Sequence, residues 1–235
     1  KWIQTLPSLG GARAMGANNP SNPQNPGVIF SVENNLDYYA LLTNLCKVLP
    51  STDTDKATFQ AEAVSIKSWL KNSAYDSTAG LFRRGVNANP DTTQALDTNS
   101  WALLVLGPDV LASDFGINID QFVGRIESAF AVKNDGSFGG NDYTLWKGFD
   151  YSNSINAGLI GRQGIAWVEG TQHMISAYGQ ISAYYAARGD AALAAKYSQR
   201  QNYFMGLNTS YGVSSQGGSA LLHTTSASRV RIFND

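Results

Sequence analysis

Residues 167–174 read Trp-Val-Glu-Gly-Thr-Gln-His-Met. The acidic residue begins a stretch in which apolar residues recur at the spacing of a helix. Two earlier stretches have the same form: residues 31–39 (Ser-Val-Glu-Asn-Asn-Leu-Asp-Tyr-Tyr) and residues 95–101 (Ala-Leu-Asp-Thr-Asn-Ser-Trp). The acidic residues are 64 and then 72 residues apart, and a recurrence on this scale indicates a repeated structural unit. We therefore predict three helices that each begin with a carboxylate. These carboxylates are Glu33, Asp97 and Glu169.

A helical hairpin follows each acidic motif in the sequence pattern. The first helix of each pair is apolar or aromatic, whereas the second carries Lys, Arg, Gln and Glu on one side. An inner helix surrounded by protein and an outer helix facing water is the alternation that an (α/α) toroid requires. We predict an all-α protein, a single toroid or partial-toroid domain over residues 1–235, with a long decorated loop at residues 133–164. The expected helices are residues 34–50, 59–72, 97–106, 119–131, 169–188 and 191–205.

Composition excludes several classes of function. The chain of 235 residues has 17 basic and 18 acidic residues, and no basic stripe that would indicate nucleic-acid binding. No apolar run approaches the ~18 residues of a membrane span. A low charged fraction of 15% with many small polar residues favours a secreted or periplasmic protein. With only His173 and His223 as histidines and no Gly-rich phosphate loop, we expect no metal site and no cofactor.

Three motifs together resemble the inner-helix motifs of bacterial six-hairpin glycosidase-like proteins. They are Ser-x-Glu-x-Asn-x-Asp at residues 31–37, Ala-Leu-Asp-x-x-Ser-Trp at 95–101 and Trp-Val-Glu-Gly-Thr at 167–171, and Phe-Arg-Arg-Gly at 82–85 resembles the segment before the second motif. The resemblance covers roughly residues 10–205 and implies an (α/α) barrel that acts on an oligosaccharide or polysaccharide. A closed ring needs twice the three hairpins present. The chain is therefore expected to be the later part of a longer protein, or to close against its loops or a second copy in a homo-oligomer.

The chemistry of the acidic motifs follows from their place at helix starts. A helix N-terminus has unpaired N–H groups and about half a positive charge, which stabilise a carboxylate. Packed helices lie ~8–10 Å apart, which fits the ~6.5–9.5 Å between the carboxyl groups of inverting glycosidases better than the ~5–5.5 Å of retaining ones. We predict Glu33 and Glu169 as the acid–base pair, with Asp97 positioning water or substrate. The alternative for each is an ordinary helix cap or dipole complement.

Aromatic and charged residues near the motifs are predicted to bind the sugar. Aromatic rings suit the apolar face of a sugar, and arginine suits a carboxylate or hydroxyl. His173 is four residues after Glu169 and shares its helix face. For each residue the alternative is core packing or a structural ion pair, although Tyr143, Trp146 and Tyr151 are expected to be exposed in the long loop. The predicted substrate-binding residues are Asp37, Tyr38, Arg83, Arg84, Trp101, Trp146, Trp167 and His173.

Two other functions fit the same residues. A polysaccharide lyase would use Tyr143 or His173 as its base and Arg83 or Arg84 to neutralise a uronate. A non-catalytic carbohydrate-binding protein would keep the aromatic residues on a glycosidase fold that has lost its activity. The leading interpretation remains a glycoside hydrolase.

Overall fold

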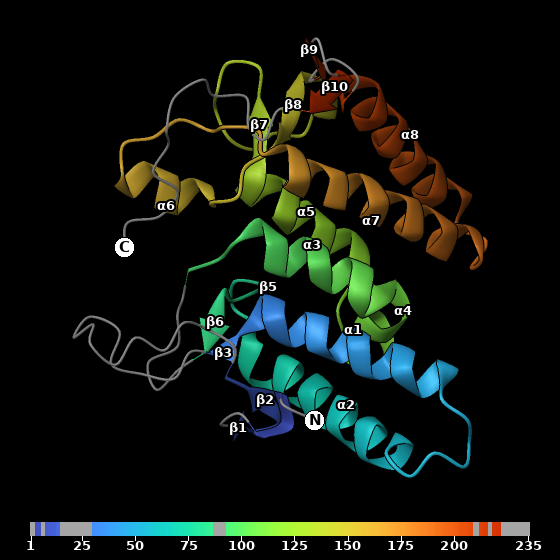
Figure 1. Ribbon diagram of the computed structural model, residues 1–235. Coiled ribbons are helices and arrows are strands. Elements are labelled where there is room, and N and C mark those ends of the chain that lie inside the picture. The colour runs from blue at the N-terminus through green and yellow to red at the C-terminus, as the bar shows by residue number, and fades with distance from the viewer. Residues whose placement is uncertain are drawn as a thin grey trace. The chain divides into compact units, whose positions relative to one another are not determined.

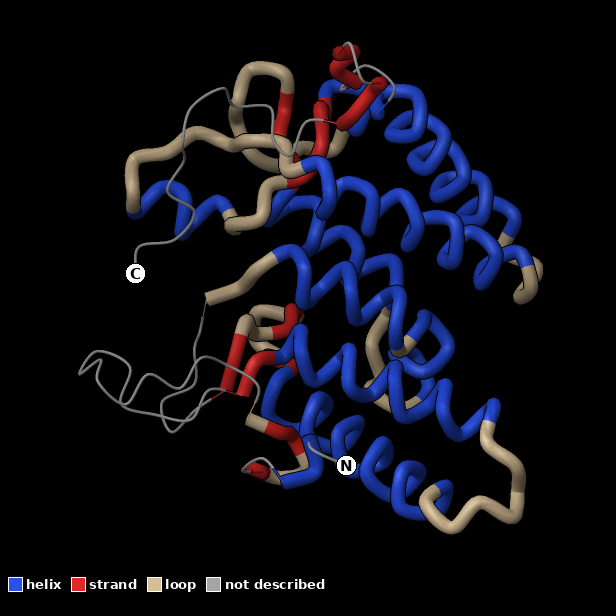
Figure 2. Tube along the Cα trace, viewed as in Figure 1, coloured by secondary structure: helices blue, strands red, loops and turns tan. Residues whose placement is uncertain are grey.

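The computed structural model describes residues 3–5, 8–14, 30–86, 93–208, 212–215 and 218–221 (Figure 1). Eight α-helices dominate these residues, and the strands among them form only two-stranded pairs (Figure 2). The mostly helical class predicted from the sequence is therefore confirmed. The chain divides into two compact units, Lys1–Gln94 and Ala95–Asp235. None of the helices in the described ranges has the length and apolarity needed to cross a membrane.

The first unit is built around one helical hairpin. Helix α1 (Val32–Val48) packs against α2 (Lys56–Trp69), and α2 runs on into a π-helical turn (Leu70–Ala74). Ser31 caps α1, since its hydroxyl accepts a hydrogen bond from the Asn34 amide at 3.2 Å. Short strands complete the unit: β1 (Ser8–Leu9) with β2 (Ala12–Arg13), β3 (Phe30–Ser31) with β6 (Gly85–Val86), and β4 (Tyr75–Asp76) with β5 (Leu81–Phe82).

The second unit contains the two remaining predicted hairpins and several elements that were not predicted. Its helices and strands are, in order, α3 (Leu96–Val105), α4 (Gly107–Ser113), α5 (Ile119–Phe130), β7 (Ala131–Lys133), a 3-10 turn (Tyr143–Leu145), β8 (Trp146–Phe149), α6 (Ser154–Leu159), α7 (Val168–Ala186), α8 (Ala191–Asn208), β9 (Gly212–Ser215) and β10 (Gly218–Leu221). Helices α7 and α8 form an antiparallel pair (Figure 1).

Two sequence expectations about this unit need correction. Gly107 ends α3 as predicted, with a left-handed φ of 78°, but the chain begins α4 at once. Pro108 is compatible with this second start because proline is tolerated in the first turn, where its missing N–H has no partner to lose. The long loop at 133–164 is only partly irregular, since β8 pairs with β7 and α6 follows.

Aromatic side chains form the core of the second unit. Trp146, Phe149, Tyr178 and Phe204 are fully buried, and Tyr178 stacks on Phe204 with ring centroids 6.1 Å apart. Phe149 contacts both Phe204 and Tyr178, at 5.2 and 6.4 Å between centroids. These residues come from β8, α7 and α8, so the aromatic cluster fixes β8 against the last hairpin.

A buried acidic residue, Glu127 of α5, lies beside this core. The Tyr178 hydroxyl donates to its Oε1 at 2.8 Å, and Nη1 of Arg200 lies 2.9 Å from the same oxygen without the alignment of a hydrogen bond. Burial raises the pKa of Glu127 to about 6, because it penalises the charged form more than Arg200 and Tyr178 stabilise it. Glu127, whose carboxyl group titrates near pH 6, therefore connects α5 to Tyr178 of α7 and Arg200 of α8.

The substitution Glu127→Gln tests this buried group. The folded protein holds the Glu127 proton more tightly than an ordinary glutamate with a pKa of 4.5, so wild type is favoured at low pH and loses that stability as the pH rises through about 6. We expect the free energy of unfolding of wild type, relative to E127Q, to fall by about 2 kcal/mol between about pH 4 and about pH 7. Urea denaturation across this range measures the difference. Parallel pH profiles for the two proteins would contradict it.

Candidate functional site

The three predicted carboxylates occupy the same position in their helices. The N-cap residues are Ser31 for α1, Ala95 for α3 and Trp167 for α7, and each acidic residue is the second residue after its cap. Asp97 is therefore not itself the cap, contrary to the simplest alternative for it. At this position a side chain lies beside the unpaired N–H groups of the first turn. The repeat recognised in the sequence thus recurs in the local structure.

In the second unit, one short segment connects the starts of two of these helices. The carbonyl of Phe149 accepts a hydrogen bond from the Trp167 amide at 2.7 Å, and the carbonyl of Tyr151 accepts one from the Leu96 amide at 3.0 Å. The segment from residue 149 to 152 therefore runs past both helix starts. Asp97 follows Leu96 directly and Glu169 comes two residues after Trp167, so both acidic residues closely follow a backbone hydrogen bond to this segment.

Ring contacts one helical turn further on bring the same two helices together. Asp97 and Trp101 share a face of α3, and Glu169 and His173 share a face of α7, because each pair is four residues apart. The Trp101 and His173 rings meet with centroids 4.9 Å apart. Since α3 packs against α7 at these rings, the carboxylates one turn earlier lie at the same end of the interface.

A row of aromatic rings extends from this contact. The Trp167 ring meets His173 edge to face with centroids 6.1 Å apart, and Tyr151 meets Trp167 edge to face at 5.1 Å. The four rings Tyr151, Trp167, His173 and Trp101 are all partly exposed. The second unit therefore combines two carboxylates with a partly exposed aromatic row, which is the combination expected of a sugar site.

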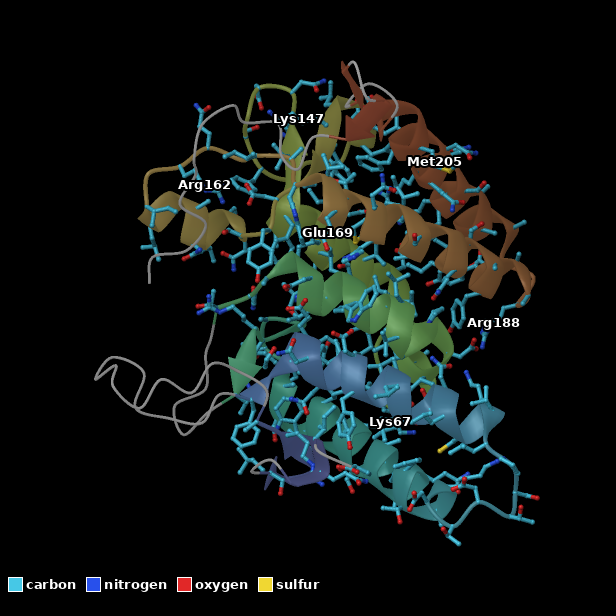
Figure 3. The ribbon with its side chains drawn as sticks, viewed as in Figure 1. Lys67, Lys147, Arg162, Glu169, Arg188 and Met205 are labelled. Carbon is cyan, nitrogen blue, oxygen red and sulfur yellow. The ribbon has the colours of Figure 1, made fainter. Side chains whose placement is uncertain are left out.

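The two carboxylates have different surroundings. Asp97 is only 5% exposed, and its Oδ1 accepts a hydrogen bond from the Thr98 amide at 2.6 Å. Glu169 is exposed at the beginning of α7 (Figure 3). The fold therefore shields Asp97 from solvent, whereas Glu169 is open to it.

Apart from Trp146, the other predicted site residues belong to the first unit. Glu33 and Asp37 are exposed on the first turns of α1. Tyr38 is buried, and its pKa is raised first by burial and then by a hydrogen bond to Glu62. Arg83 donates to the Ser73 carbonyl at 2.8 Å and to Asp76 at 3.1 Å, and Arg84 is partly buried.

Trp146 lies away from solvent, contrary to the expectation that it is exposed in the loop. It is fully buried in β8, where it stacks near Phe204 with centroids 6.3 Å apart. The pairing of β8 with β7 turns Trp146 into the aromatic core. A buried Trp146 supports the fold of this unit and offers no face to a ligand.

Sequence reasoning missed two residues beside the site, Asp150 and Arg162. Both nitrogens of the Arg162 fork donate to Asp150, at 2.6 and 2.9 Å, and both side chains are largely buried. The only local signal was the pattern Asp-x-Ser at residues 150–152, in which Asp150 accepts from the Ser152 amide. Asp135 and Asp142 make the same turn on the surface, so this signal does not single out Asp150.

No family model matches this chain, and no curated protein matches it. Across the described residues, no three His, Cys, Asp or Glu side chains are grouped so as to hold a metal ion. His223 lies outside those residues.

The close approach of α3 and α7 depends on Gly170. A Cβ at this position would lie 2.6 Å from Leu96 Cδ2 and 2.3 Å from the Trp167 ring, well inside contact distance. The glycine therefore lets the starts of α3 and α7 pack directly beside Asp97 and Glu169. Gly124 of α5 provides a matched control, because a Cβ added there would meet nothing within 4 Å.

We expect Gly170→Ala to lower the free energy of unfolding by about 1–3 kcal/mol, because overpacking outweighs the gain in helix propensity. Gly124→Ala should instead stabilise the protein by up to about 1 kcal/mol. Urea denaturation followed by tryptophan fluorescence measures both. Equal effects of the two substitutions would show that α3 and α7 do not meet at Gly170.

Proposed function

We propose that this chain is a carbohydrate-active enzyme, a glycoside hydrolase of the (α/α) toroid type in which Asp97 and Glu169 supply the acid–base chemistry. The observation that carries the proposal is that Asp97 and Glu169 have equivalent positions in two helices that pack together, with a row of partly exposed aromatic rings one turn further on. The sequence predicted Glu33 as the partner of Glu169. Glu33 has the equivalent position in α1 but belongs to the first unit, so the proposal takes Asp97, which is in the same unit as Glu169, as the partner instead.

We favour hydrolysis with inversion, because the usual spacing of packed helices suits the wider carboxyl separation of inverting enzymes. One carboxylate takes a proton from water while the water oxygen attacks the anomeric carbon. The other, protonated, gives its proton to the glycosidic oxygen as the bond to the anomeric carbon breaks. Helices packed ~8–10 Å apart leave room for that water between carboxylates at their starts. The aromatic row would receive the apolar face of the sugar, with the substrate an oligosaccharide or polysaccharide.

The arginine side chains give less support to the alternative that the protein is a polysaccharide lyase. Its uronate would need a guanidinium group. The predicted candidates, Arg83 and Arg84, both belong to the first unit, and Arg83 already donates to Asp76 and to the Ser73 carbonyl. In the second unit Arg162, Arg188 and Arg200 are each paired with a carboxylate. We therefore propose a glycan without uronate groups as the substrate.

The substitution Glu169→Gln tests the proposal. Loss of the acid or base should lower turnover by about 10²- to 10⁴-fold, and Asp97→Asn should do the same. The assay follows reducing-end release from a panel of cello-, xylo-, manno-, malto- and chito-oligosaccharides. Asp109→Asn is the matched control, because Asp109 is also in the first turn of a helix but is exposed and paired with Arg188.

Three outcomes would overturn the proposal. Wild-type turnover by E169Q would remove Glu169 from the chemistry. Absorbance from a new double bond in the product would indicate a lyase. Tight binding of an oligosaccharide that the wild-type protein never cleaves would indicate a carbohydrate-binding protein.

A further inference from the structure

The buried Asp150 carboxylate accepts four hydrogen bonds close to the starts of α3 and α7. It accepts from both Nη atoms of Arg162, from the Ser152 amide at 2.9 Å and from the Ile165 amide at 2.7 Å. Asp150 is only 3% exposed. Four donors around a buried carboxylate hold it in one orientation. This arrangement makes Asp150 well suited to holding its surroundings in place.

The residues on either side of Asp150 are the ones that bind the two helix starts. The Phe149 carbonyl accepts from the Trp167 amide, and the Tyr151 carbonyl accepts from the Leu96 amide. The Asp150 amide itself donates to the Phe130 carbonyl at the end of α5, at 2.8 Å. The orientation of one buried side chain therefore determines where two carbonyls point, and these carbonyls hold the first residues of α3 and α7.

Thr171 adds a second connection between this segment and α7. Its hydroxyl accepts from the Phe149 amide at 3.1 Å and donates to the Trp167 carbonyl at 2.8 Å. The first turn of α7, which carries Glu169, is thus tied to Phe149 through both backbone and side chain. Any rotation of the peptide groups around Asp150 would be passed directly to that turn.

We propose that Asp150 and Arg162 are positioning residues that set the relative placement of Asp97 and Glu169. Arg162 orients Asp150, Asp150 fixes the segment from residue 149 to 152, and that segment fixes the two helix starts. This inference rests on the proposed function, because it gives the pair a role in the same reaction. Neither residue touches the substrate.

Arg162→Lys is the most direct variant. Lysine keeps the positive charge but lacks the planar fork that bonds both oxygens of Asp150. We expect kcat on the cleaved oligosaccharide to fall by about 10- to 100-fold, since misplacement of reacting groups by about 1 Å costs up to about 10²-fold. KM should change by less than about threefold, because the aromatic row remains.

The matched control is Arg188→Lys. Arg188 pairs with Asp109 at 2.5 Å, but both side chains are substantially exposed. Such a pair contributes little, so R188K should leave kcat and KM unchanged. Asp150→Asn, which keeps the shape and removes the charge, serves as a second variant if R162K does not fold.

A spectroscopic arm tests positioning without any substrate. The side-chain carboxyl carbons of Asp97 and Glu169 are observed by ¹³C NMR in wild type, R162K and R188K at one fixed pH. We expect both signals to shift in R162K and neither to shift in R188K. Unchanged signals in a folded R162K would overturn the inference.

The two proposals fail in different ways. If E169Q loses turnover while folded R162K keeps the wild-type kcat, the positioning role is wrong and the proposed function stands. If E169Q keeps full turnover, the proposed function is wrong. The NMR signals of the Asp97 and Glu169 carboxyl carbons then decide alone whether Asp150 and Arg162 position the helix starts. Loss of folding in both R162K and D150N would also overturn the inference, because the pair would then determine folding rather than placement.

Discussion

The second unit depends on a backbone constraint at the starts of α3 and α7. The Leu96 amide at the start of α3 and the Trp167 amide at the N-cap of α7 both donate to carbonyls of the same four-residue segment. Amide groups at a helix start have no partner within the helix, so these two bonds also satisfy donors that would otherwise be exposed or unpaired. These two hydrogen bonds therefore hold the first turns of α3 and α7, which carry Asp97 and Glu169, to one segment of the chain.

Rigidity at this point comes from buried polar groups rather than from the helices alone. Asp150 and Arg162 neutralise each other inside the fold, and backbone amides of Ser152 and Ile165 complete the coordination of the carboxylate. A buried ion pair of this kind contributes little net stability, because desolvation offsets its attraction. The ion pair instead fixes orientation, because both carboxylate oxygens of Asp150 accept hydrogen bonds from defined donors. Glu127 differs, because the Arg200 beside it is less well aligned and burial dominates its titration.

The sequence was sufficient to predict six of the eight helices in the described residues, and the acidic residues that three of them carry in their first turns. Glu33, Asp97 and Glu169 each follow an apolar residue and precede a helical pattern, and all three prove to be second after an N-cap. Local signals of this kind do not depend on the rest of the fold. The toroid and the single domain over residues 1–235 remain predictions, and the chain divides into two compact units.

The sequence was insufficient where a residue's role depends on distant contacts. Trp146 lies in a Gly- and Asp-rich stretch typical of an exposed loop, yet strand pairing and contact with Phe204 bury it. Asp150 makes the same kind of local turn as the surface residues Asp135 and Asp142. Only its contact with Arg162 distinguishes it from them. Tertiary contacts of this kind leave no periodicity in the chain.

The central claim is that Asp97 and Glu169 act together on one substrate. A double-mutant cycle on turnover tests it most directly, with Asp97→Asn, Glu169→Gln and the double variant assayed on the same oligosaccharide. Residues that act as a unit are strongly non-additive, so the double variant should lose about as much turnover as the worse single variant. Losses that multiply would show that the two carboxylates act independently and would contradict the account.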